Sequence, residues 1–144
     1  MIQLSKAIFT ATVFLSLLLF VSCGKASTDA LDEMIDSSTP VTSIVSGDFS
    51  GAEGQNVSGQ AKIFKVNNGF QLKLENFRTD NGPDLKVYLS KSGRPDGFIS
   101  LGDIKSTNGN QVYDIPGNPD FKVHRFVLIH CERFNHLFGR DEMK

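Results

Sequence analysis

The sequence predicts an all-β protein, built as an antiparallel β-sandwich or a barrel-like single domain, on three observations. Apolar and polar residues alternate with a period of two in several short segments after residue 45, which is typical of strands with one face on a core. Turn-forming residues separate those segments, among them three Asn-Gly pairs. Residues 45–144 are also enough chain for a hydrophobic core of their own. We therefore expect one β domain over residues 45–144.

The first 22 residues have the features of a secretory signal peptide. Lys6 gives a basic start, and residues 7–22 form an apolar run shorter than the about 20 residues of a membrane-spanning helix. Leu-Phe-Val-Ser ends this run and precedes Cys23, which resembles a relaxed bacterial lipobox. We expect residues 1–22 to be removed as a lipoprotein signal peptide and Cys23 to carry lipid such as palmitate. An ordinary cleaved signal is the alternative.

Lipid on Cys23 would place the protein in the cell envelope, with the membrane as a partner. Gly24 follows the cysteine in place of an acidic residue, which in the sorting pattern of enteric lipoproteins indicates the outer membrane, facing the periplasm or the surface. Residues 23–44 would be the lipidated cysteine and a flexible linker, because a segment rich in Ser, Thr and Asp cannot bury enough apolar surface for a core. Two helical turns over residues 29–36 are an alternative for part of it.

The first strands of the β domain are predicted around a hairpin. Residues 61–66 and 70–76 flank Asn68-Gly69, and the second of these segments alternates apolar and polar residues. We expect the Asn-Gly pair to close a hairpin, with a positive φ angle in its turn. The pairs Asn81-Gly82 and Asn108-Gly109 are expected to supply positive φ angles in further tight turns.

A rigid corner is predicted at Asn81, Gly82, Pro83 and Asp84. Pro83 fixes its own φ angle and restricts Gly82, while the Asn81 and Asp84 side chains are suited to bond nearby backbone amides. Turn chemistry accounts for each of these residues, so we expect a structural role. A ligand-binding corner is the alternative.

Two later segments predict strands with different surroundings. Residues 85–90 alternate Leu or Val with Lys86, Tyr88 and Ser90, which predicts a strand whose second face is wet. Residues 123–129 are apolar at both odd and even positions, except at His124 and Arg125. Both faces of this strand would therefore be apolar, which predicts a central strand covered on both faces.

The composition excludes several classes of function. The chain has 15 basic and 16 acidic side chains, so it lacks the positive surplus of a nucleic-acid binder, and we expect no nucleic-acid partner. Its two cysteines, Cys23 and Cys131, are far apart, which excludes zinc ribbons, thioredoxin-like sites and covalent c-type haem attachment. No serine stands in a nucleophile elbow, and no glycine loop of the phosphate-binding kind is present.

Lipidation of Cys23 would leave Cys131 as the single thiol, an odd cysteine in an oxidising compartment. Cys131 ends the most hydrophobic strand and shares the parity of Val127 and Ile129, which favours a buried, structural side chain. The functional interpretation is a redox thiol or a thiolate ligand. The residues themselves leave both interpretations open.

The three histidines recur every six residues around this thiol, at His124, His130 and His136. In an extended strand His130 and Cys131 point to opposite faces, so they would not share a metal ion. No carboxylate is placed to complete a facial site either. We therefore expect no metal site.

Three motifs in the β region are more specific than any of these single residues. Asn-Gly-Pro-Asp at 81–84 leads into an alternating strand, Gln-x-Tyr-x-Ile-Pro follows at 111–116, and Cys-x-x-Phe at 131–134 precedes Phe-Gly at 138–139. Together these motifs resemble the DM-thirteen domain, and the resemblance extends over residues 45–140. It implies a β-rich extracellular or periplasmic module, often found beside DOMON domains, with an electron-transfer role around one cysteine.

On this chain the resemblance makes that cysteine Cys131. The implied chemistry is either a bare thiol that changes redox state or a thiolate that holds a prosthetic group such as haem, and an absent cofactor is expected equally. A redox partner protein is implied as well. His130 stands where the family commonly has an aromatic residue, and the charged residues after Gly139 predict that the last strand ends early. The alternative function is a non-catalytic module for protein binding, glycan binding or adhesion, with Cys131 structural in the core.

Overall fold

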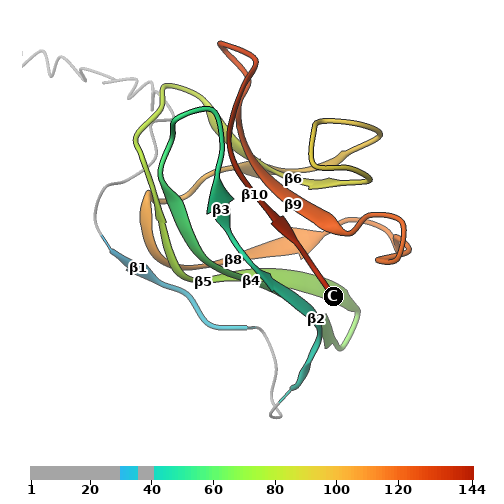
Figure 1. Cartoon of the computed structure of the whole chain (residues 1–144). Coiled ribbons are helices and arrows are strands. Elements are labelled where there is room, and N and C mark those ends of the chain that lie inside the picture. The colour runs from blue at the N-terminus through green and yellow to red at the C-terminus, as the bar shows by residue number, and fades with distance from the viewer. Residues whose placement is uncertain (1–29, 36–40) are drawn as a thin grey trace, which may run out of the picture.

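The structure, a computed structural model, describes residues 30–35 and 41–144, which form a two-layered β-sandwich (Figure 1). The prediction of an all-β single domain is confirmed. The strands are β1 (Leu31–Asp32), β2 (Ser43–Asp48), β3 (Ser50–Gly51), β4 (Val57–Val66), β5 (Gly69–Thr79), β6 (Leu85–Ser90), β7 (Ile99–Asp103), β8 (Asn108–Ile115), β9 (Phe126–Cys131) and β10 (His136–Glu142).

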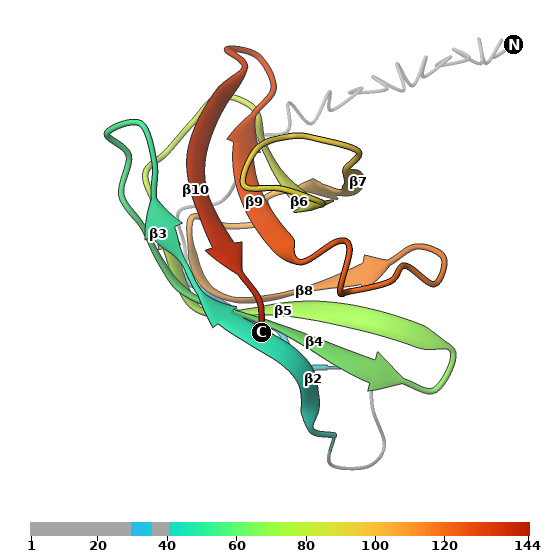
Figure 2. The ribbon, with the colours of Figure 1, turned by 45° about the vertical axis from the view of Figure 1, so that its right-hand side comes forward.

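Each layer is a five-stranded sheet. The first sheet has the strand order β1-β8-β5-β4-β2, and the second has the order β3-β10-β9-β6-β7. All neighbours pair antiparallel except β1 and β8, which are parallel. Figure 2 shows β4, β5 and β8 in one layer, with β6, β9 and β10 in the other. Because both sheets turn an apolar face inward, the core lies between them.

The inter-sheet core is built from alternate residues of both sheets, as the period-two pattern predicts. Ile63, Leu72 and Leu74 of the first sheet are fully buried, and so are Val87 and Ile129 of the second. At one end of this core the rings of Phe49 and Phe77 pack edge to face, with 5.5 Å between their centroids.

The predicted hairpin is present as β4 and β5, but its turn differs from the expectation. Val66 pairs with Gly69 at the end of the ladder. Among the three Asn-Gly pairs only Gly109 has a positive φ angle, 102°, and it lies inside β8 rather than in a turn. A Cβ atom at Gly109 would lie 2.0 Å from the carbonyl oxygen of Leu31. The glycine therefore lets β1 approach β8, which a local turn prediction does not consider.

Two helical turns over residues 29–36 are not borne out by the described part of that range: residues 30–35 contain no helix, and β1 pairs parallel with β8 there. Leu31 pairs with Gly109, and the carboxylate of Glu33 lies 2.7 Å from Nζ of Lys105 and accepts a 2.8 Å hydrogen bond from the Val112 amide. The predicted signal peptide, Cys23 and most of the linker lie outside the described residues. In the described part of the chain, no helix has the length and apolarity to cross a membrane.

Strand β9 is central and buried on both faces, as predicted, although it begins at Phe126 rather than at Val123. It lies between β6 and β10 in the sheet. Val127 and Ile129 face the inter-sheet core, and Leu128 packs against Tyr88 on the outer face. Val123 precedes the strand and is exposed.

The second face of β6 is buried, so the expectation of a wet face there is wrong. Tyr88 is 2% exposed and Ser90 is fully buried, because the loop 91–98 folds back over the outer face of this sheet. The Ser90 hydroxyl holds the loop: it lies 2.7 Å from the carbonyl oxygen of Arg94 and accepts a 3.2 Å hydrogen bond from the Asp96 amide. Phe98, at the end of the loop, stacks on the Tyr88 ring.

The charged C-terminal residues extend the pairing of β10, so the expectation of an early end to the last strand is wrong. The backbones of Lys144 and Ser46 exchange hydrogen bonds of 2.9 and 3.3 Å, which join the two sheets along this side. Asp141 is 1% exposed at the same seam and accepts a 3.2 Å hydrogen bond from the Ala61 amide. Burial raises the pKa of Asp141 to about 6. A Cβ atom at Gly47 would lie 1.9 Å from Oδ1 of Asp141.

Candidate functional site

Cys131 is the last residue of β9 and has no exposed surface. It pairs with Leu85 of β6 on one side and with His136 of β10 on the other, and its side chain belongs to the inter-sheet core. His130 points to the outer face, where its ring lies 5.7 Å from that of Tyr88. The two neighbours therefore face opposite ways, as the strand geometry predicts.

The predicted corner meets this end of β9. The carbonyl oxygen of Asp84 accepts a 3.0 Å hydrogen bond from the Glu132 amide, and the Asp84 carboxylate lies 2.9 Å from Nζ of Lys86. Gly82 lies so close to its neighbours that a Cβ atom there would come within 2.7 Å of Leu85 and 3.0 Å of Phe138. These contacts give the corner a packing role beside Cys131.

Asn81 and Pro83, the other two corner residues, are exposed. The four-residue segment thus presents Gly82 and Asp84 to the strand ends and turns its other two side chains to water. Motifs that are far apart in the sequence, around 81–84, 131–134 and 138–139, come together at one end of the sandwich.

The surroundings of Cys131 do not fit a haem. The thiol is enclosed among core side chains, and Cys131 lines none of the four described pockets. A thiolate that binds haem iron needs a cavity for the macrocycle on its open side. Within residues 30–35 and 41–144, no group of three or more His, Cys, Asp and Glu side chains could hold a metal ion.

A second cluster lies on the outer face of the same sheet, across β9 from the thiol. The Tyr88 hydroxyl donates a short hydrogen bond to Oε1 of Glu132. The Tyr88 ring stacks on Phe98, with 4.1 Å between centroids and an interplanar angle of 21°. Burial, and then the Glu132 carboxylate, raise the pKa of Tyr88. Burial lowers the pKa of His130, whose Nδ1 atom has no hydrogen-bond partner.

This cluster does not follow from the sequence patterns. The alternation over residues 85–90 predicts Tyr88 on a wet face, and no motif assigns Glu132 to a site. The available signal was the loop 91–98, whose Gly93, Pro95 and Gly97 allow a sharp return of the chain over the preceding strand. In an alternating strand, an aromatic residue that occupies a polar position just before such a loop is a candidate for burial beneath the loop.

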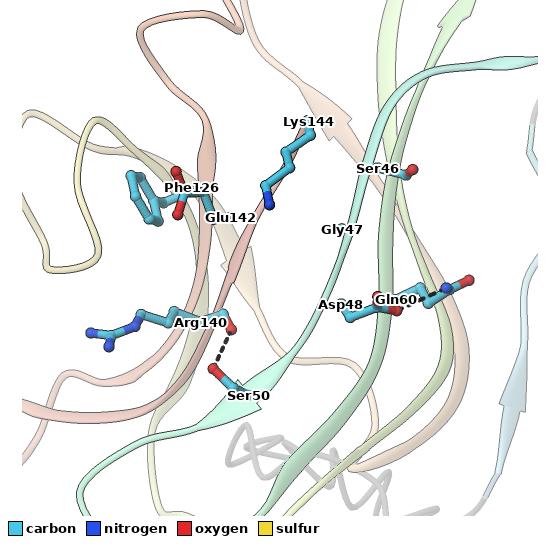
Figure 3. Close-up of a pocket in the computed structure, with 9 residues that line it drawn as sticks. All are labelled: Ser46, Gly47, Asp48, Ser50, Gln60, Phe126, Arg140, Glu142 and Lys144. Atoms are coloured by element: carbon cyan, nitrogen blue, oxygen red, sulfur yellow. Dashed lines mark hydrogen bonds between the residues drawn. The ribbon is translucent and has the colours of Figure 1, made fainter.

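The described pockets lie elsewhere. A polar pocket of about 450 Å³ opens between β2 and β10, and Figure 3 shows Lys144 pointing into it while Gln60 bonds to Asp48 across β2 and β4. Its lining carries both signs of charge, with Arg140 and Lys144 against Asp48 and Glu142. An apolar pocket of about 600 Å³ lies beside it, around Phe70 and Phe121. Both lie toward the Phe126 end of β9, and neither is lined by Cys131.

Comparison with known proteins gives one result that agrees with this arrangement. The sequence model of the family described as Electron transfer DM13 matches residues 48–142, which is more than half of the chain. That match includes the corner, Cys131, and the outer-face cluster. No curated protein and no solved structure gives a significant match. By the family match, this chain belongs to the DM13 electron-transfer family.

Proposed function

We propose that this chain is a lipid-anchored electron-transfer protein of the cell envelope, and that the bare thiol of Cys131 is its redox group. The observation that carries the proposal is the position of Cys131. It is the free cysteine of the described residues, and it lies where the segments 81–84, 131–134 and 138–139 come together. The poor fit of a haem at this thiol favours chemistry of the sulfur itself.

Access to the thiol depends on the turn that follows it. Residues 132–135 connect β9 to β10 at the surface, Phe134 is 69% exposed, and Asn135 has a positive φ angle of 47°. The free energy needed to open a hairpin end locally is much lower than the free energy needed to unfold the whole domain. Opening of this end separates Cys131 from His136 and brings the thiol to solvent, while the buried centre of the sheet stays paired.

The chemistry proposed for the opened state is thiol–disulfide exchange with a redox partner protein. The Cys131 thiol loses its proton, and its sulfur attacks a disulfide of the partner. The partner's S–S bond breaks, a mixed disulfide forms, and the leaving sulfur takes up a proton. The Cys131 sulfur is oxidised and the leaving sulfur is reduced, and attack by a second thiol reverses the step.

A second candidate is a module for protein binding, glycan binding or adhesion in which Cys131 is structural. The observation in its favour is the complete burial of the thiol, since free cysteine is often a small core residue. The two candidates differ in one measurable property, the reactivity of the folded protein at Cys131.

The lipid anchor and the envelope location are proposals based on the N-terminal sequence. Processing before Cys23 leaves this residue first in the chain, with its thiol blocked by lipid. We expect the outer membrane, and a domain that faces the periplasm or the cell surface. Intact mass of the full-length product should show loss of residues 1–22 and gain of acyl groups. Cys23→Ser should move the protein out of the membrane fraction, and an unchanged membrane share would overturn the anchor.

The test of the thiol uses the processed protein in detergent and glutathione disulfide as the probe. We expect one glutathione adduct on the wild-type protein. The rate of adduct formation should stop rising at high glutathione disulfide concentration, because local opening of the β9–β10 hairpin end then limits the reaction. Cys131→Ala should form none. The control Cys131→Ala with Asn118→Cys, at an exposed loop position, should react without that plateau. If wild type reacts only after urea unfolding, the redox role fails and the binding module stands.

A further inference from the structure

We propose that Tyr88 and Glu132 form a second redox site, at which Tyr88 gives one electron to an oxidised metal centre of a partner protein and its phenolic proton to Glu132. This site is on the opposite face of β9 from Cys131 and does not depend on the chemistry of that thiol. It therefore goes beyond the function proposed above. Four features of the structure support it: the proton acceptor, the route of the electron, the shielding of the ring, and the contrast with Tyr113.

The proton acceptor is already in place. The Tyr88 hydroxyl donates to Oε1 of Glu132. The backbone of Glu132 is fixed by the hydrogen bond from its amide to Asp84, 3.0 Å long, so the carboxylate is held over the phenol. Removal of an electron alone would leave a positive charge on a buried ring, which is costly. Transfer of the proton to Glu132 in the same step avoids that charge, and the exposed side of Glu132 releases the proton to water.

The route of the electron to a partner passes through a side chain at the surface. Phe98 stacks on Tyr88, with 4.1 Å between the ring centroids, and is itself 42% exposed. Tyr88 is 2% exposed. The oxidised ring is thus shielded from water and from coupling with other molecules, while a partner that docks on Phe98 lies against a ring in contact with it.

The step is balanced in atoms and electrons. The O–H bond of Tyr88 breaks, an O–H bond forms on the Glu132 carboxylate, and a neutral tyrosyl radical is left. The oxidant gains one electron. Return of one electron to the radical, and of one proton taken up from water through Glu132, restores the starting state.

Tyr113 is the chain's other tyrosine and lacks these features. Its hydroxyl donates to Oε1 of Gln111 at 2.8 Å and accepts a hydrogen bond from the Lys105 amide at 3.1 Å. Neither group takes up a proton. Nζ of Lys105 lies 5.1 Å from the ring centroid, and its positive charge opposes removal of an electron. The comparison predicts that oxidation is confined to Tyr88.

The experiment oxidises the full-length protein with hexachloroiridate(IV) and detects the radical by rapid-freeze electron paramagnetic resonance. We expect a tyrosyl signal in wild type, in Tyr113→Phe and in Cys131→Ala, and none in Tyr88→Phe. Urea unfolding of each variant verifies that the fold is retained. Persistence of the signal in Tyr88→Phe, or its loss in Tyr113→Phe, would overturn the assignment of the radical to Tyr88.

The role of Glu132 is tested by the rate of oxidation. Glu132→Gln keeps the shape of the side chain but removes the proton acceptor, and the rate should fall by at least about tenfold, since a positioned acid or base contributes about 10²–10⁴-fold. Glu142→Gln is the matched control, because Glu142 pairs with Arg125 at 3.2 Å and touches no tyrosine hydroxyl. Equal rates in Glu132→Gln and Glu142→Gln would overturn proton transfer to Glu132. Signal loss in Cys131→Ala would show instead that oxidation proceeds through the thiol.

Discussion

Replacement of Cys131 by serine tests whether its thiol lies in a closed, apolar site. The side chain has no exposed surface and belongs to the inter-sheet core. Serine is nearly the same shape as cysteine, but its hydroxyl needs a hydrogen-bond partner. A buried hydroxyl without one costs about 1–3 kcal/mol. Alanine loses only the sulfur and its packing, at about 1 kcal/mol.

The expected order of stability is therefore wild type, then Cys131→Ala, then Cys131→Ser, with serine about 1–2 kcal/mol below alanine. This order is diagnostic, because serine is the closer match to cysteine in size. Equilibrium unfolding in urea, followed by circular dichroism, gives both free energies, and an unchanged slope would show that the variants share one denatured state. A serine variant as stable as the alanine variant would refute the closed site, and with it the claim that local opening limits the reactivity of the thiol.

Three further predictions concern the seam between the two sheets and the loop that covers the outer face of β6. Gly47→Ala should lower the free energy of unfolding in urea by about 1–3 kcal/mol, because its Cβ atom would meet the Asp141 side chain. Gly69→Ala is the control and should be nearly neutral, because the space around Gly69 is open. Equal effects of the two substitutions would contradict this packing. The folded-state pKa of Asp141, about 6, lies above its ordinary 3.8, so wild type should lose stability as pH rises from about 4 to 6. Asp141→Asn should lack that slope, and a slope that persists would exclude Asp141 as its source. Ser90→Ala should cost about 1–2 kcal/mol and speed proteolysis of loop 91–98, and unchanged cleavage would show that Ser90 does not hold the loop.

The sequence was sufficient where local patterns decide the structure. The alternation in residues 70–76 and the turn residues before it predict the β4–β5 hairpin, because register and burial there depend on neighbours in the chain. The apolar run ending at Cys131 likewise predicts a central strand with the thiol and His130 on opposite faces. Both features follow from a period of two and need no knowledge of distant segments.

The errors concern contacts that an alternating pattern within one strand does not describe. The burial of Tyr88 depends on a loop that returns over its own strand, and its bond to Glu132 joins residues 44 positions apart. The pairing of β1 with β8 needs the positive φ angle of Gly109, which the sequence analysis assigned to a turn. Cys131 was recognised from its motif, but its enclosure and its separation from the described pockets are properties of the packed sandwich.

A redox titration tests the proposed role of Cys131 as the redox group of this DM13 electron-transfer protein. The processed protein is equilibrated in glutathione buffers of varied disulfide-to-thiol ratio, and the fraction of Cys131 in mixed disulfide is read by intact mass. We expect a reversible transition while the circular dichroism spectrum stays native, and no transition in Cys131→Ala. A thiol that stays reduced at every ratio until the protein unfolds would contradict it.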